Sequence, residues 1–273
     1  MTDRYAVIGN PISQSKSPFI HSTFAQQTGQ DMEYTRIEGT LGAFAQDAEA
    51  FRKVGGRGMN ITAPFKLDAF AYATEHSERA RLAGAVNALK FEGDRILAEN
   101  FDGIGLVRDL THNLACPLRV KRVLLLGAGG ATRGALLPFL EQQPAALVIV
   151  NRTLATAQQL AGSFAHAGPV SAAGYGDLGA QQFDVVLNAT SASLRAELPP
   201  LPASVFAPGA LAYELAYGKG LTPFLRLAQS AGVQRLADGV GMLAEQAAEA
   251  FEWWRGVRPG TKDVIAQLTV PLV

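Results

Sequence analysis

Residues 123–134, with the sequence VLLLGAGGATRG, decide which fold this chain is expected to have. The stretch is typical of a continuous apolar strand, a turn containing Gly127, Gly129 and Gly130, and the start of a helix. Glycines at such a turn let a diphosphate approach the backbone N–H groups at the positive end of the helix. Thr132 stands where the common GxGxxG pattern has its third glycine, so an ordinary strand-to-helix turn is the alternative.

The end of the following strand indicates which dinucleotide would bind. After AALVIV come Asn151, Arg152 and Thr153, where an acidic residue would hold the ribose 2′-hydroxyl of NAD. No carboxylate is present, and an arginine suits a 2′-phosphate through its charge and its planar set of donors. The sequence therefore predicts NADP, with a solvated surface charge as the alternative for Arg152 alone. One strand later, Asn188 and Thr190 of NATS are expected beside the nicotinamide, or else as a polar strand cap.

The rest of the chain alternates strands and helices, which indicates parallel sheets. We predict the α/β class with two α/β domains: an N-terminal substrate domain with a mainly parallel sheet, and a C-terminal Rossmann domain, with a cleft between them. The first is expected to cover residues 1–101, joined by C-terminal helices in 239–273. The second is expected to cover residues 102–238. Residues 81–103 are expected to form a hairpin, with its turn at Gly93 and Asp94.

Length and composition limit the classes of protein. With 273 residues, 48% of them hydrophobic, the chain can form two cored domains. Lys plus Arg and Asp plus Glu each number 24, so the net charge gives no electrostatic case for nucleic acid or an acidic membrane. The single cysteine, Cys116, excludes an internal disulfide and a cysteine-rich zinc site and fits a reducing cytoplasm. No apolar run is long enough for a signal peptide or a membrane span.

The composition, together with the motifs described below, leads to expectations about location and partners. We expect a cytoplasmic protein, a monomer or homodimer, with a small-molecule substrate, no metal, and neither nucleic acid nor membrane as a partner.

The stretch NITAPFK, residues 60–66, supplies a candidate for proton transfer. Pro64 blocks a regular helix and a central strand, so the stretch is expected to turn at a strand end and present Lys66. Hydride transfer to a carbonyl also needs one proton, carried by a group within hydrogen-bond reach. The four histidines lie in no catalytic context, whereas a lysine can carry a proton if its surroundings lower its pKa. We therefore pair Lys66 with Asp102 of ENFDG; the alternative for Lys66 is a solvated charge at a helix start.

Several motifs together resemble the shikimate dehydrogenase family over essentially the whole chain. They are GNPISQSKSPFIH, NITAPFK, AGAVNAL, ENFDGIG, GAGGATRG, NRT, NATS, YGKGLTPF and DGVGMLAEQAAEAF. Their number, order and spacing are far more specific than one glycine loop. The resemblance implies reversible NADPH-dependent reduction of 3-dehydroshikimate to shikimate, in the biosynthesis of aromatic amino acids.

The resemblance also implies a role for each matching residue. Lys66 and Asp102 are the implied catalytic pair. The substrate would contact both of these residues and Ser15, Ser17, Asn60, Thr62, Asn87, Tyr213 and Gln246. The implied cofactor site consists of Gly127, Ala128, Gly129, Gly130, Ala131, Asn151, Arg152, Thr153, Asn188, Thr190, Gly239 and Met242.

The chain departs from the family pattern at four positions. Phe101 replaces a threonine before Asp102, and Ala88 replaces a threonine after Asn87. Ser193 and Glu214 replace a glycine and an aspartate, respectively. These changes leave the chemistry intact and bear on substrate affinity and specificity. Two further hypotheses follow: a quinate/shikimate dehydrogenase that tolerates NAD, and a non-catalytic NADP-binding homologue.

Overall fold

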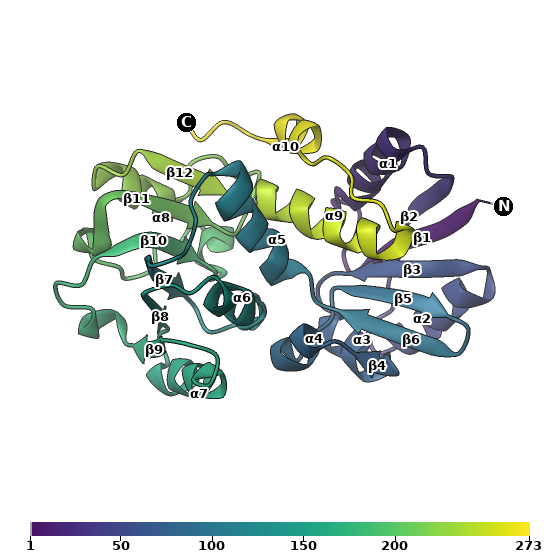
Figure 1. The fold of residues 1–273 in the computed structure, drawn as a ribbon, viewed down its shortest axis with the longest axis horizontal. Coiled ribbons are helices and arrows are strands. Elements are labelled where there is room, and N and C mark those ends of the chain that lie inside the picture. Colours follow the sequence, from purple (N-terminus) through teal and green to yellow (C-terminus); the bar gives the residue numbers. More distant parts are fainter. Residues whose placement is uncertain (1) are drawn as a thin grey trace. The chain divides into compact units, whose positions relative to one another are not determined.

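Two six-stranded sheets organise the chain, each in its own unit (Figure 1). The structure is a computed structural model that describes residues 2–273. One unit is Met1–Gly105 with Ala244–Val264, and the other is Leu106–Leu243 with Ile265–Val273. The sequence-based boundaries differ from this division at three places: residues 102–105 belong to the first unit, and residues 239–243 and 265–273 belong to the second. The boundaries fall inside helices α5 (Asp102–Arg108), α9 (Val240–Arg255) and α10 (Lys262–Leu268).

The sheet of the first unit is mixed, with the strand order β2-β1-β3-β5-β6-β4. The pairs β1–β2, β1–β3 and β4–β6 are parallel, while β3–β5 and β5–β6 are antiparallel. The predicted hairpin is therefore present, with Gly93 in its turn at a φ of 60°. The strands are β1 (Asp3–Gly9), β2 (Met32–Glu38), β3 (Gly56–Ile61), β4 (Glu75–His76), β5 (Ala88–Glu92) and β6 (Arg95–Glu99).

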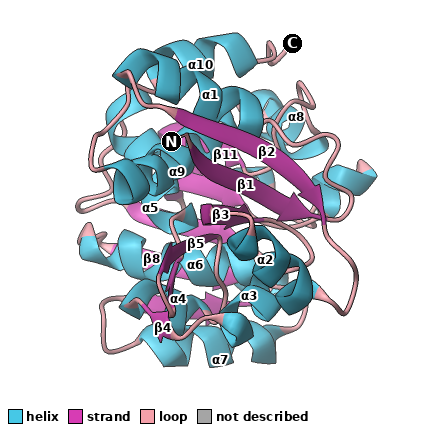
Figure 2. Ribbon diagram, turned by 90° about the vertical axis from the view of Figure 1, so that its right-hand side faces the viewer, coloured by secondary structure: helices cyan, strands magenta, loops and turns pink. Residues whose placement is uncertain are grey.

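Helices cover both faces of this sheet (Figure 2). Residues of α9 pack with Tyr5 and Tyr34 on one face, where α1 (Ser17–Thr28) also places His21 against Tyr34. On the other face, α2 (Phe44–Lys53), α3 (Lys66–Tyr72) and α4 (Glu78–Ala83) contribute to a second apolar cluster. Helix α1 ends at Gly29, which has a left-handed conformation that glycine adopts easily. The short helices α3 and α4 were not predicted, because neither is long enough to show a clear hydrophobic period.

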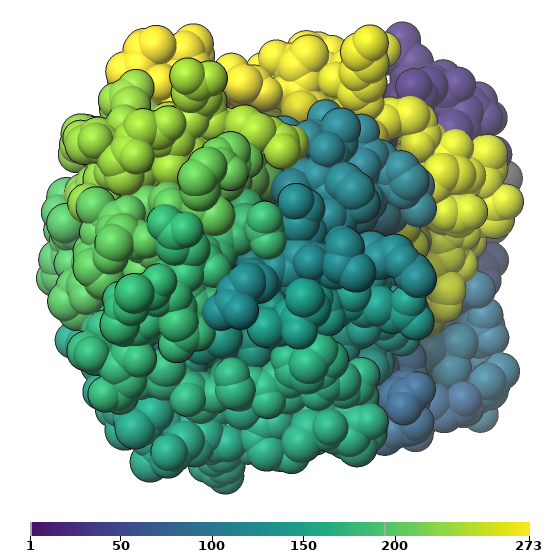
Figure 3. All heavy atoms as spheres, turned by 60° about the vertical axis from the view of Figure 1, so that its left-hand side comes forward, coloured from purple at the N-terminus to yellow at the C-terminus, as the bar shows by residue number. Residues whose placement is uncertain are grey.

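The second unit has a fully parallel sheet with the strand order β12-β11-β10-β7-β8-β9. Counted from β7, this is the doubly wound order 3-2-1-4-5-6 of a Rossmann fold, so the predicted fold class is confirmed. Teal and green atoms of this unit form the face turned to the viewer in Figure 3. The strands are β7 (Arg122–Leu126), β8 (Ala146–Val150), β9 (Val170–Ala173), β10 (Phe183–Asn188), β11 (Phe206–Glu214) and β12 (Arg235–Asp238).

Alternating strand residues bury both faces of this sheet. Leu124 and Leu126 of β7 pack in one cluster with Phe224 of α8 (Pro223–Ser230), while Val123 and Leu125 are also fully buried. The remaining helices of this unit are α6 (Gly130–Glu141) and α7 (Leu154–Phe164). Helix α5 is followed directly by a π-helical turn, Asp109–Asn113. Among residues 2–273, no helix is long and apolar enough to cross a membrane.

A close approach at Gly58 holds α9 against the first sheet. The Trp254 indole N–H donates to the Leu89 carbonyl at 3.0 Å, directly over Gly58. A Cβ atom at Gly58 would lie 2.6 Å from Trp254 Nε1 and 2.7 Å from the Leu89 oxygen. Only a glycine therefore lets the C-terminal part of α9, and with it the segment that carries Gln246, pack on this sheet.

We predict that Gly58→Ala destabilises the protein, because the added methyl displaces the indole from its hydrogen bond. Overpacking and the lost bond together should cost about 2–4 kcal/mol in the free energy of unfolding, measured in urea. Gly162→Ala is the matched control, since nothing lies within 4 Å of its Cβ position and it sits in helix α7. The control should be neutral or slightly stabilising. Equal effects of the two substitutions would contradict this packing.

Candidate active site

Lys66 is positioned by a turn between β3 and α3. Thr62 to Phe65 form this turn, in which the Phe65 amide donates to the Thr62 carbonyl at 3.0 Å and the Ala63–Pro64 peptide is cis. Lys66 is the first residue of α3, and its Nζ lies 2.5 Å from Oδ2 of Asp102, just beyond β6. The expected pair is therefore in contact, with side chains 35% and 15% exposed.

Asn87 holds the carboxylate of this ion pair. Its Nδ2 donates to Asp102 Oδ1 at 2.8 Å and to Gln246 Oε1 at 3.2 Å. Its own Oδ1 accepts from the Phe101 amide at 2.8 Å, which fixes the orientation of the Asn87 side chain. Both carboxylate oxygens of Asp102 therefore accept hydrogen bonds, Oδ2 from Lys66 and Oδ1 from Asn87. The bond from Asn87 holds the carboxylate in the orientation in which Oδ2 faces Lys66.

Of the other expected substrate residues of this unit, Asn60 is bonded directly to this network. Asn60 is buried at the end of β3, and its Nδ2 donates to the Asn87 carbonyl at 3.3 Å. Ser17 begins α1, and its amide donates to the Ser15 hydroxyl at 3.3 Å. Thr62 is half-buried, and its amide donates to the Ile8 carbonyl. One ammonium, one carboxylate, amides and hydroxyls can together bind a polyhydroxylated acid and transfer a proton to it.

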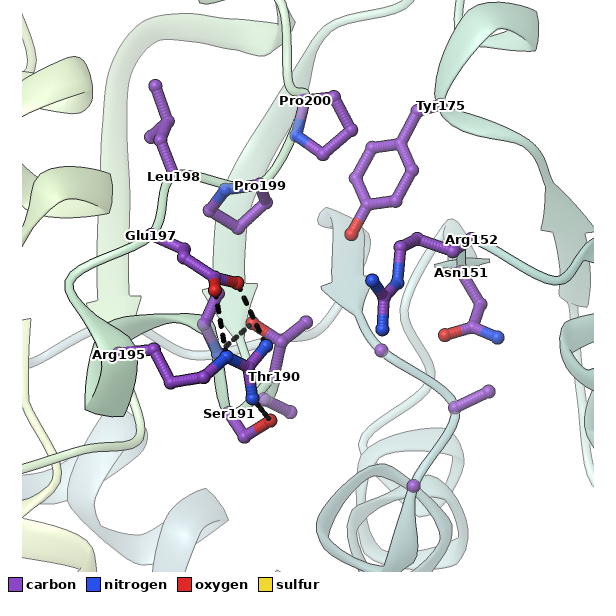
Figure 4. A pocket seen from close by; sticks show the side chains of 15 residues that line it. Asn151, Arg152, Tyr175, Thr190, Ser191, Arg195, Glu197, Leu198, Pro199 and Pro200 are labelled. Atoms are coloured by element: carbon purple, nitrogen blue, oxygen red, sulfur yellow. Dashed lines mark hydrogen bonds and ion pairs between the residues drawn. The ribbon is translucent and has the colours of Figure 1, made fainter.

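A pocket of about 500 Å³ in the second unit contains the glycine loop (Figure 4). Gly127 has a φ of 99°, and a Cβ there would lie 3.1 Å from Thr190. A Cβ at Gly129 or Gly130 would meet nothing within 4 Å, so the entrance to the N-terminus of α6 is open. This shape fits a diphosphate at the helix start. The expected residues that line the pocket are Gly127, Ala128, Gly129, Asn151, Arg152 and Thr190.

The remaining expected cofactor residues lie beside this pocket or elsewhere in the unit. Gly130 and Ala131 begin α6, and Thr153 precedes α7. Asn188 is fully buried, and Gly239 and Met242 lie at the junction of β12 and α9. None of these residues lines the pocket.

The sequence did not identify Tyr175 or residues 195–200 as part of this pocket. Tyr175 and Arg152 lie on one side of the pocket, and Arg195 and Glu197 lie on the other, followed by residues 198–200 (Figure 4). Burial raises the pKa of Tyr175, against a lowering effect of the nearby Arg152. Arg195 donates to both carboxylate oxygens of Glu197 at 2.9 Å. Tyr175 follows β9, a strand that was not predicted, so its place at the same sheet edge was missed.

Two departures from the family pattern are bonded to each other. The Ser193 hydroxyl donates to Oε2 of Glu214, a fully buried carboxylate. Asn188 Nδ2 and Thr222 Oγ1 donate to the same oxygen, each at 3.0 Å. Asn188 in turn accepts from the Thr190 hydroxyl at 2.7 Å. The buried carboxylate therefore supports the strand end that lines the nucleotide pocket.

The other two residues that depart from the family pattern, Phe101 and Ala88, also lie close together. Phe101 and Ala88 belong to the same apolar cluster on the α9 face of the first sheet. The Phe101 ring is 4% exposed and packs edge-on against Trp253, with centroids 5.6 Å apart. The Phe101 ring therefore has a packing role in the core of the first unit.

Tyr213 has no hydroxyl hydrogen available for a substrate. It is fully buried, and its hydroxyl donates to Asp109 Oδ2 at 2.7 Å within the second unit. Its assignment as a substrate contact is revised on this ground. Tyr217, the second tyrosine of the same segment, is 40% exposed.

Three sequence profiles match this chain in succession. They are described as "Shikimate dehydrogenase substrate binding domain" over residues 7–89, "Shikimate / quinate 5-dehydrogenase" over 109–196, and "Shikimate 5'-dehydrogenase C-terminal domain" over 239–269. A curated relative from Nitrosospira multiformis, named "Shikimate dehydrogenase (NADP(+))", is 56% identical over 268 residues, 98% of each chain. A relative of the same name from Chromobacterium violaceum is also 56% identical over 98% of each chain.

Solved structures agree over the full length. An Ael1 enzyme from Pseudomonas putida is 64% identical, with a TM-score of 0.97 and 100% coverage of both chains. A shikimate 5-dehydrogenase from Thermus thermophilus, in complex with NADP(H) and shikimate, is 30% identical, with a TM-score of 0.87. That match covers 97% of this chain and 98% of the other.

We predict that Ser193→Ala destabilises the second unit in a pH-dependent way. Burial raises the pKa of Glu214, against the lowering effect of its hydrogen bonds, the largest from Ser193. A carboxyl whose folded pKa is raised weakens the fold as pH rises through that pKa, and losing a donor to the charged form makes this worse. The loss should be about 1–3 kcal/mol at pH 8 and smaller at pH 5, measured by urea unfolding.

Ser191→Ala is the matched control for this variant, since Ser191 is exposed and its hydroxyl accepts from Arg195. Its unfolding should change little at either pH. A Ser193→Ala effect of equal size at both pH values would show that the carboxylate is not what the hydroxyl supports.

Proposed function

Because the chain belongs to the shikimate dehydrogenase family, we propose that it catalyses the reversible NADPH-dependent reduction of 3-dehydroshikimate to shikimate. This is a reaction of the shikimate pathway of aromatic amino-acid biosynthesis. The observation that carries the proposal is the Lys66–Asp102 ion pair, fixed by Asn87, in a chain 56% identical to enzymes named for this reaction.

In the proposed complex, small polar side chains bind the substrate in place of a large basic patch. The hydroxyls of Ser15 and Ser17 bind the substrate carboxylate, with Asn60 and Thr62 beside them. Asn87, Asp102 and Gln246, already joined by hydrogen bonds, bind the ring hydroxyls. Such local capture of an anion suits a chain with no net charge.

Lys66 carries the proton in the proposed mechanism. Bound NADPH supplies the hydride that reduces the carbonyl carbon at C3. Lys66 Nζ donates a proton to the carbonyl oxygen, which becomes the hydroxyl of shikimate, and in the reverse direction Nζ takes that proton back. Asp102 holds Nζ at 2.5 Å, and Asn87 prevents the carboxylate from rotating. Positioning of this kind is what acid–base catalysis requires.

The pocket of the second unit fits NADP. The glycine turn and the open N-terminus of α6 suit the diphosphate, and Arg152 suits the 2′-phosphate. Tyr175, beside Arg152, offers an aromatic wall for the adenosine half. We also propose a cytoplasmic location, as suits a biosynthetic enzyme with one cysteine, and a monomeric or homodimeric state.

Initial rates on the purified protein test the function. Shikimate and quinate are each offered with NADP and with NAD, and reduction of the cofactor is followed by absorbance. We predict turnover with shikimate and NADP far above the other three combinations. Comparable rates with quinate or NAD would indicate the broader quinate/shikimate activity. Binding of NADP without turnover in any combination would indicate a non-catalytic homologue.

We predict that Arg152→Gln separates the two cofactors. Losing the guanidinium should raise the KM for NADP about 10- to 100-fold, as expected for a lost charged hydrogen bond to phosphate, and leave the KM for NAD nearly unchanged. Arg119→Gln is the matched control, because Arg119 belongs to the same unit and does not line the pocket. An equal change for both cofactors would argue against a 2′-phosphate contact.

A further inference from the structure

Arg36 is held against the loop that carries Ser15 and Ser17. Its Nε and Nη2 atoms both donate to the Ser15 carbonyl, at 3.2 and 2.7 Å. Ser15 is also tied to the start of helix α1, because its hydroxyl accepts from the Ser17 amide at 3.3 Å. Two N–H groups on one carbonyl oxygen give the planar guanidinium of Arg36 a defined place, although the residue is exposed.

The register of three neighbouring strands places Arg36 level with Asn60. Val7 of β1 pairs with Arg36 of β2 on one side and with Asn60 of β3 on the other. Neighbouring strands lie about 4.8 Å apart, so the backbones at Arg36 and Asn60 are about 10 Å apart. Both side chains lie on the face that α1 covers, where Asn60 Oδ1 accepts from the Tyr34 hydroxyl at 2.6 Å.

The positive charge of Arg36 is not neutralised by a neighbour. Among residues 2–273, no carboxylate lies within ion-pair distance of Arg36 or of Lys16, the cation of the adjacent loop. Glu38, two residues further along β2, accepts instead from the Ile12 amide at 3.1 Å. The loop and the strand end beside it therefore carry two positive charges and one negative charge. The side chains expected to bind the substrate carboxylate are all neutral: Ser15, Ser17, Asn60 and Thr62.

We propose that Arg36 is a further substrate-binding residue, which attracts the substrate carboxylate through its charge while it holds Ser15 in place. The inference rests on the proposed function, in which Ser15 and Ser17 bind that carboxylate. The hydroxyl and the carbonyl of Ser15 belong to one residue, so a carboxylate bonded to the hydroxyl lies within about 10 Å of the guanidinium. At that distance, in a partly exposed site, one unit charge changes the affinity about 2- to 20-fold.

This attraction acts on binding and not on the chemical step. The carboxylate keeps its charge while the C3 carbonyl is reduced, so Arg36 stabilises the bound substrate and the transition state equally. Loss of such uniform binding raises KM and leaves kcat unchanged. A role in holding the loop alone would depend on the paired donors of the guanidinium, which a lysine lacks.

The test compares Arg36→Lys, which keeps the charge and loses the paired donors, with Arg36→Gln, which loses the charge. The Kd for shikimate is measured by calorimetry, and KM and kcat are measured with shikimate and NADP. At an ionic strength of about 0.01 M, Arg36→Gln should raise Kd and KM about 3- to 20-fold, with kcat and the KM for NADP within about twofold of wild type. Arg36→Lys should stay within about threefold of wild type in all four quantities.

Salt separates the charge from the hydrogen bonds. At about 1 M ionic strength the screening length falls to about 3 Å, so the difference in Kd between the two variants should disappear. Arg4→Gln is the matched control, because Arg4 is also exposed and donates to a backbone carbonyl, that of Val54, at the start of β1. Its Kd for shikimate should equal that of wild type at both salt concentrations.

Three results would overturn the proposal. They are a wild-type Kd in Arg36→Gln at low salt, an Arg36→Lys enzyme as weak as Arg36→Gln, and a difference between these variants that persists at high salt. Each of them would leave the proposed function standing, since wild type would still bind and oxidise shikimate. A wild-type protein that neither binds nor oxidises shikimate would instead count against the proposed function itself.

Discussion

The ion pair between Lys66 and Asp102 is the interaction on which the rest of the first unit depends. A partly buried charge pair is stable only if the remaining polar atoms around it are satisfied. Asn87 meets that condition by donating to the second oxygen of Asp102 and to Gln246. The ends of β3 and β6 and the middle of α9 must therefore converge, and Gly58 lets α9 pack closely enough to do so.

The second unit uses a buried carboxylate in a comparable way. Glu214 accepts from Ser193, Asn188 and Thr222, and Asn188 in turn holds Thr190 at the pocket. The four residues that depart from the family pattern thus lie in two pairs of neighbours, one polar and one apolar. Ser193 bonds to Glu214, and Phe101 shares a cluster with the small Ala88. Each change keeps its surroundings packed or hydrogen-bonded, which explains how the fold tolerates it.

Sequence patterns predicted the features that depend on local order along the chain. The apolar strand before Gly127, the hairpin at Gly93 and the alternation of strands and helices gave both sheets, and strand-end reasoning paired Lys66 with Asp102. Sequence patterns did not predict side-chain contacts between segments that are far apart in the chain. Tyr34 and Tyr175 carry no motif, and Tyr213 lies in a matching motif although its hydroxyl is bonded to Asp109. Helices α3 and α4 and strand β9 are too short for periodicity to reveal.

The most direct test of this account is single-turnover reduction of 3-dehydroshikimate by the Lys66→Ala enzyme. Excess enzyme with bound NADPH is mixed with substrate, and the decay of NADPH absorbance gives the rate of the chemical step, while titration gives the Kd for substrate. We predict a rate lower by roughly 10²–10⁴, as expected for a lost general acid, with the Kd changed only a few-fold. A rate within tenfold of wild type, at a similar Kd, would contradict the assignment of Lys66 as the proton donor.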